Sequence, residues 1–121
     1  MAKVTELHSR EDFAGLLEAS RAQPVVLLKH SIACPISARA QEQFVQLEND
    51  ADPPLYCLVV QYARDVSNHV AEHSGIPHQT PQVLVFSQGA VSYHASHHAI
   101  TCGSLRDAAR DAASTQSPSE A

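Results

Sequence analysis

The chain has 121 residues, 44% of them hydrophobic, and a formal net charge of −5 with histidine neutral. This length and composition suit one globular domain with a real core. The eight Lys and Arg residues form no cluster, which argues against nucleic acid, DNA included, and against a membrane surface as partners. No stretch approaches the roughly 20 apolar residues of a membrane span, and segment 1–10 lacks the apolar core of a secretory signal. We therefore expect a cytoplasmic protein.

The first part of the chain is predicted to form a helix and then a strand. Ser9 followed by Asp12 resembles a capping box with a shorter acid, and apolar residues at helical spacing predict a helix over residues 10–21. The continuous apolar run 25–29 is typical of a central strand that is covered on both faces. Such a strand requires helices above and below the sheet.

A crossover unit is predicted next. Residues 35–48 carry one apolar stripe and form the second expected helix. Residues 55–62 form a second buried strand, and the helical crossover predicts parallel pairing of the two strands with right-handed topology. Asp65 is expected to cap a short third helix, and Gly75 fits the position just after its end.

The last part of the chain is predicted to be a hairpin and a helix. Two strand-like runs, 82–87 and 90–96, are joined by a Gln-Gly pair, which predicts a β-hairpin and an antiparallel part of the sheet. Thr101 is the expected N-cap of the last helix, and Ile100 with Leu105 would make its hydrophobic staple. These elements predict an α/β fold with a mixed sheet between helices.

The stretch 29–37, K-H-S-I-A-C-P-I-S, has a cysteine between the end of an apolar strand and the start of a predicted helix. Pro35 suits the first helical position, so Cys34 falls at or beside the N-cap. The free amides of Ile36 and Ser37 and the helix dipole favour a thiolate, which can lower a cysteine pKa from roughly 8.5 into the ~3.5–7.5 range. The alternative is a buried, inert cysteine. We expect Cys34 to be a nucleophile.

The C-P-I-S motif at 34–37 has the Cys-x-x-Cys frame of thioredoxin-like redox proteins, with serine at the second cysteine position. The longer K-H-S-I-A-C-P-I-S string, with T-P-Q at 80–82, resembles the monothiol bacilliredoxins of the YtxJ type over about residues 4–113. The resemblance implies a thioredoxin-like fold, with a mixed sheet of about four strands flanked by about four helices. We expect one domain over residues 1–113 and a disordered polar tail over 114–121.

The resemblance also implies a second half of the site. The Thr80-Pro81 bond is expected to be cis, with Pro81 packed beside Cys34. The Thr80 backbone groups would then be free to pair with the backbone of a bound thiol or peptide. Pro35 and Ile36 complete the expected substrate-binding residues.

Ser37 is expected to make the chemistry monothiol. A mixed disulfide on Cys34 must then be resolved by an outside thiol or by another cysteine of the chain. The Ser37 hydroxyl either donates to the Cys34 sulfur or satisfies the local backbone, and both interpretations stay open. Of the other two cysteines, Cys57 is expected in the core. Cys102, in the first turn of the last helix, could resolve the disulfide only with its Cα within about 7 Å of that of Cys34, or on a mobile segment.

The eight histidines raise the question of a metal. His69 and His73 have the i, i+4 spacing of two ligands but lack the H-E-x-x-H pattern, and the cluster at 94–98 has no nearby cysteine or carboxylate at ligand spacing. No metal site is expected. His30, at the end of the first central strand, either tunes the Cys34 thiolate electrostatically or turns to solvent or caps the sheet.

The resemblance implies an enzyme, a thiol-disulfide oxidoreductase that removes bacillithiol from S-bacillithiolated proteins. Bacillithiol would be a co-substrate, with no bound cofactor, and bacillithiol disulfide would pass to a separate reductase. Two alternatives stay open. One is a general monothiol reductase or isomerase that uses glutathione, coenzyme A or thioredoxin, and the other is a redox-sensing or binding module without turnover.

Overall fold

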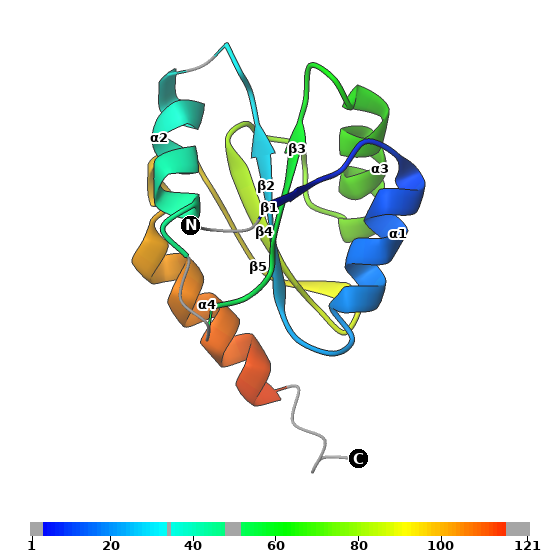
Figure 1. The fold of residues 1–121 in the computed structure, drawn as a ribbon, viewed down its shortest axis with the longest axis vertical. Helices are drawn as coiled ribbons and strands as arrows, with labels where there is room; N and C mark the ends of the chain where they lie inside the picture. The colour runs from blue at the N-terminus through cyan, green and yellow to red at the C-terminus, as the bar shows by residue number, and fades with distance from the viewer. Residues whose placement is uncertain (1–3, 34, 48–51, 116–121) are drawn as a thin grey trace.

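The computed structural model describes residues 4–33, 35–47 and 52–115, which form a five-stranded mixed sheet flanked by four α-helices (Figure 1). In chain order, the elements are β1 Val4–Glu6, α1 Arg10–Ala19, β2 Val25–His30, α2 Pro35–Phe44, β3 Leu55–Val59, α3 Arg64–Ser74, β4 Gln82–Ser87, β5 Ala90–Ser96, the 3-10 helix η1 His97–Ala99 and α4 Cys102–Thr115. None of the helices in these ranges is long and apolar enough to cross a bilayer.

The strand order is β1-β3-β2-β4-β5, which confirms the α/β class and the thioredoxin-like layout. Strands β1, β3 and β2 run parallel, whereas β4 is antiparallel to β2 and β5 is antiparallel to β4. The predicted crossover and hairpin are both present. Strand β1 was not predicted, because it has only three residues, all with exposed side chains, and pairs at the edge of the sheet with β3.

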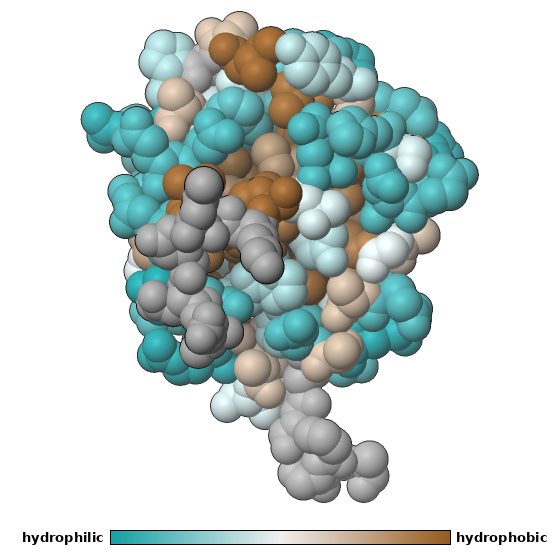
Figure 2. Space-filling view, in the orientation of Figure 1, coloured by the Kyte–Doolittle hydropathy of each residue, from teal (hydrophilic) through white to brown (hydrophobic). Residues whose placement is uncertain are grey.

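The two faces of the sheet carry separate cores, because side chains alternate along β2. Val25 and Leu27 pack with α1 and α3, whereas Val26 and Leu28 pack with α2 and α4. Figure 1 shows these helix pairs on opposite sides of the sheet. Figure 2 shows hydrophobic side chains gathered along the middle of this view, between two largely hydrophilic flanks. The uninterrupted apolar run of β2 therefore follows from burial on both faces.

Some predicted boundaries were too long, and one predicted cap was wrong. Helices α1 and α2 and strand β3 each end two to four residues before the predicted positions. The N-cap of α3 is Ala63, which makes no side-chain cap hydrogen bond. Asp65 instead lies in the first helical turn, where its carboxylate accepts two hydrogen bonds from the Arg10 guanidinium at 3.0 and 3.1 Å. Gly75 ends this helix in a left-handed conformation with φ of 74°, as predicted.

The other predicted helix starts are present in detail. The Ser9 hydroxyl accepts from the Asp12 amide at 3.1 Å, and the Asp12 carboxylate accepts from the amide one residue before the cap. Thr101 and Ser104 bond reciprocally, each side-chain oxygen accepting from the other's amide. Helix α4 continues to Thr115, past the predicted domain boundary at 113, and residues 116–121 of the predicted tail lie outside the described residues.

Candidate functional site

The candidate site lies where β2 ends and α2 begins. Strand β2 stops at His30, and Pro35 is the first residue of α2, the position that its sequence context predicted. Pro35 is exposed and Ile36 is half-buried. Cys34, the expected nucleophile, lies outside the described residues, whereas its chain neighbours on both sides are described.

Ser37 is fully buried in the first turn of α2. Its hydroxyl oxygen accepts a hydrogen bond from the Ser31 amide at 3.3 Å. This contact joins the helix to the loop that follows β2, so the hydroxyl does satisfy the local backbone. Because the oxygen is the acceptor here, the hydroxyl proton is still available to donate to another group.

A glutamine that the sequence analysis did not single out holds this loop from the neighbouring strand. The Gln61 side chain, just after β3, donates to the Ser31 hydroxyl at 2.8 Å and accepts from the Ile32 amide at 3.3 Å. The Ser31 hydroxyl also accepts from the Ala33 amide at 3.4 Å. Sequence reasoning placed residue 61 inside a buried strand, and its polar side chain at the carboxyl end of that strand was the available signal.

His30 is buried rather than turned to solvent, with 7% of its surface exposed. Burial lowers the pKa of the His30 imidazole, and a hydrogen bond with the Ser37 backbone partly opposes this shift. The ring is therefore neutral near pH 7, and its Nδ1 atom has no hydrogen-bond partner within the described part of the chain. The predicted influence on the Cys34 thiolate stays a prediction, but a full positive charge on this ring would not supply it.

The sheet brings the Thr80-Pro81 pair to the carboxyl end of β2, the end that leads into α2. The antiparallel register pairs Lys29 with Gln82, which puts Pro81 beside the last residue of β2. The Thr80-Pro81 peptide bond is cis, and Pro81 is buried. Within the described residues the Thr80 backbone makes no hydrogen bond, whereas the Pro81 carbonyl accepts from the His97 amide at 3.1 Å.

Comparisons with known proteins agree with this arrangement. The family model of the monothiol bacilliredoxin BrxC matches residues 5–105. The chain belongs to the monothiol bacilliredoxin family. Membership in this family gives it a monothiol redox function of the thioredoxin-like type.

Solved structures share the fold of this bacilliredoxin family member. A candidate oxidoreductase with a thioredoxin fold is 33% identical, with a TM-score of 0.79 over 87% of this chain and 92% of that chain. A poplar thioredoxin h mutant is 17% identical, with a TM-score of 0.77 over 99% of this chain and 90% of that one. Thioredoxin f from spinach chloroplast, short form, is 18% identical, with a TM-score of 0.71 over 92% and 94% of the two chains.

The two described cysteines of this bacilliredoxin family member differ in their surroundings. Cys57 lies in β3 with 8% of its surface exposed, which confirms its place in the core. Burial, and to a smaller extent the Glu6 carboxylate, raises the pKa of the Cys57 thiol to about 11. Cys102 is half-buried at the start of α4, where its amide donates to the Gln43 side chain at 3.0 Å. Its predicted resolving role stays a prediction.

We expect Cys57 to resist alkylation in the folded protein. With its pKa at about 11, the thiolate fraction at pH 7 is on the order of 10⁻⁴, and burial also blocks access. The measurement is mass spectrometry of cysteine peptides after a timed exposure to iodoacetamide, with urea-unfolded protein as the control. Equal rates of Cys57 labelling in folded and unfolded protein would contradict the prediction.

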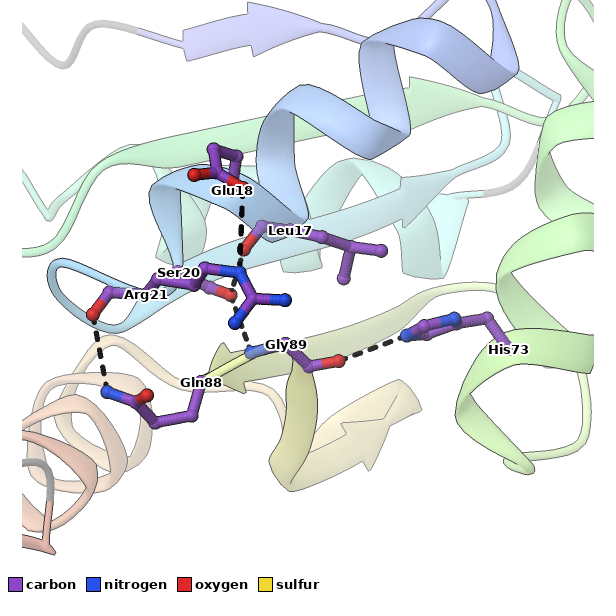
Figure 3. Close-up of polar contacts among 7 residues, drawn as sticks. All are labelled: Leu17, Glu18, Ser20, Arg21, His73, Gln88 and Gly89. Atoms are coloured by element: carbon purple, nitrogen blue, oxygen red, sulfur yellow. Dashed lines mark hydrogen bonds and ion pairs between the residues drawn. The ribbon is translucent and has the colours of Figure 1, made fainter.

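The paired histidines of α3 have a structural role. His69 and His73 both meet the Phe13 ring edge-on, with centroids 5.6 and 5.5 Å apart. Figure 3 shows His73 reaching the turn between β4 and β5, where its Nε2 lies 3.0 Å from the Gly89 carbonyl oxygen. In the same view the Ser20 hydroxyl accepts from the Gly89 amide at 2.9 Å. Within the described ranges, no three His, Cys, Asp or Glu residues are grouped as metal ligands.

Proposed function

We propose that this chain removes bacillithiol from S-bacillithiolated proteins through a mixed disulfide on Cys34. The observation that carries the proposal is the match to the monothiol bacilliredoxin model over residues 5–105, which spans the Cys-x-x-Ser motif. Serine at position 37 rules out resolution by a second thiol within this motif. The mixed disulfide must therefore be resolved by an outside thiol, which carries the cap away as a small disulfide, or by another cysteine of the chain, which releases the cap as a free thiol and leaves a disulfide with Cys34.

The proposed cycle has two exchange steps. The Cys34 thiolate attacks the bacillithiol sulfur of the capped protein, the old disulfide breaks, and the protein thiolate leaves and takes up a proton. A bacillithiol thiolate then attacks the bacillithiol sulfur on Cys34, which releases the Cys34 thiolate and bacillithiol disulfide. One mixed disulfide and one thiol give one protein thiol and one small disulfide, so the electrons balance without a bound cofactor.

The start of α2 supports a reactive thiol at position 34. Pro35 is the first helical residue, and position 34 directly precedes it in the sequence. The dipole and the free amides of a helix N-terminus stabilise an anion. A lower pKa at this position would increase the fraction of thiolate, which is the nucleophile of the first step. It would also make this thiolate a better leaving group in the second step.

The surface around this turn supports a protein as the capped substrate. Ile32, in the β2–α2 loop, is a large hydrophobic side chain that is 56% exposed. Figure 2 shows hydrophobic surface at the end of the molecule where the β2–α2 loop lies. We propose that the Thr80 backbone, together with Pro35 and Ile36, receives the substrate chain. The proposal includes a cytoplasmic location and a bacillithiol disulfide reductase as downstream partner, with neither nucleic acid nor membrane as a partner.

The test is turnover with a defined cap. A model protein carrying bacillithiol on one cysteine is incubated with catalytic amounts of the reduced chain and excess bacillithiol, and cap release is followed by intact mass. We expect many turnovers per chain, a bacillithiol adduct on Cys34 during the reaction, and release faster than from the same protein carrying glutathione. Equal rates with both caps would instead indicate a general monothiol reductase. Release limited to one equivalent would indicate a sensor or binding module.

A further inference from the structure

The central strand carries a buried lysine at its carboxyl end. Lys29 has none of its surface exposed, and it lies on the same face of β2 as Val25 and Leu27, toward α1 and α3. Burying an ammonium is unfavourable, and here it lowers the pKa of Lys29 to about 8. A methionine or leucine would fill this position without that cost. Packing alone therefore does not account for a lysine at this position.

The Lys29 amine contacts α3 and the segment between α3 and β4. Its Nζ donates to the Ser67 carbonyl of α3 at 3.2 Å and lies 3.3 Å from the Nδ1 atom of His78. The Ser67 hydroxyl lies 3.1 Å from the same ring nitrogen. His78 is itself exposed, so its ring lies between the buried amine and solvent.

A second buried side chain, Gln82, contacts the segment between α3 and β4 that also contains His78. Gln82 faces Lys29 across the β2–β4 register, is 2% exposed, and donates from Nε2 to the Pro77 carbonyl at 3.0 Å. Its Oε1 atom has no partner within the described residues. Cross-strand partners share one face of a sheet. Two neighbouring polar side chains therefore anchor consecutive residues, Pro77 and His78, just before the Thr80-Pro81 pair.

We propose that Lys29 is a positioning residue for thiol-disulfide exchange, which acts through His78 to hold residues 77–81 where the Thr80 backbone receives the protein substrate. This inference rests on the proposed function. Lys29 is separated from Ser67 by 38 residues and from His78 by 49, so the contact ties the segment to the central strand rather than to its own neighbours. The substrate that depends on this anchor is a polypeptide, because a small thiol has little backbone to pair with Thr80.

The test compares Lys29→Met with the parent chain. We expect the variant to raise KM for the bacillithiolated model protein about tenfold with kcat changed less than about twofold, because uniform binding is lost rather than chemistry. The alkylation rate of Cys34 by iodoacetamide should stay unchanged. Hydrogen exchange of backbone amides in residues 76–80 should accelerate.

His78 variants provide matched comparisons. His78→Asn keeps an acceptor close to the position of Nδ1 and should retain a near-parental KM, whereas His78→Leu should raise KM as Lys29→Met does. The double variant Lys29→Met with His78→Leu should be no worse than either single one, since both remove the same contact. His94→Leu, an exposed histidine of β5 outside the cluster, should leave KM unchanged.

Three results would overturn the inference. An unchanged KM in Lys29→Met would show that Lys29 does not affect substrate binding. Unchanged hydrogen exchange in residues 76–80 would show that Lys29 does not hold this segment in place. Equal losses in kcat and in Cys34 alkylation would assign the effect to the thiol instead. A fourth outcome, an inactive parent chain with accelerated exchange in the variant, would overturn the proposed function and with it the positioning role, while the contact between Lys29 and residues 77–81 would stand. If Lys29→Met fails to fold, the contrast between His78→Asn and His78→Leu decides the question.

Discussion

Cys34→Ser is expected to reduce release of bacillithiol at least about a thousandfold, to the rate without protein. A serine hydroxyl at this position forms no disulfide, so neither exchange step can begin. The measurement is multiple-turnover release from the capped model protein, read by intact mass. The same spectra should show no bacillithiol adduct on the variant.

The other cysteines provide the controls. Cys57→Ala should turn over within about twofold of the parent, because its thiol is buried and protonated at neutral pH. Cys102→Ser separates the two routes of resolution. An unchanged rate at limiting bacillithiol would assign resolution to the external thiol, and a slower rate would assign it to Cys102. Turnover of Cys34→Ser within tenfold of the parent would contradict the assignment of the nucleophile.

Phe13→Ala is expected to lower the free energy of unfolding by about 3–5 kcal/mol, the largest stability loss predicted here. The Phe13 ring is fully buried and meets three rings edge-on: His69, His73 and Phe86, the last with centroids 5.6 Å apart. Its loss leaves a cavity between α1, α3 and the sheet and removes three aromatic contacts. Urea unfolding followed by circular dichroism measures the change, and the midpoint of thermal unfolding should fall by roughly 10–20 °C.

Phe13→Leu is the matched variant. It keeps most of the apolar volume but removes the aromatic edge contacts, so its loss should be about 1–2 kcal/mol. A loss below about 1 kcal/mol in Phe13→Ala would show that the site collapses around the missing ring. Similar losses in both variants would mean that the ring contacts, rather than the filled volume, dominate.

Much of the fold could be predicted because its signals are local. The apolar run of β2, the Pro35 start of α2, the glycine that ends α3 and the Thr101 cap of α4 each involve residues close together in sequence. Local patterns also indicated the monothiol motif and the core position of Cys57. Helix and strand signals of this kind need only backbone sterics, capping and hydrophobic periodicity.

The remaining features were decided by contacts between distant segments. Asp65 looked like a cap but bonds to Arg10, 55 residues away, and Gln61 holds the loop after β2 from about 30 residues away. Strand β1 exists because the edge of β3 was open to pair with three exposed residues. Local sequence patterns were enough to predict the class of fold and the residue types of the site. The polar side chains that hold the site became identifiable only in the packed chain, because hydrogen bonds between elements depend on how the chain packs and leave no periodic pattern in the sequence.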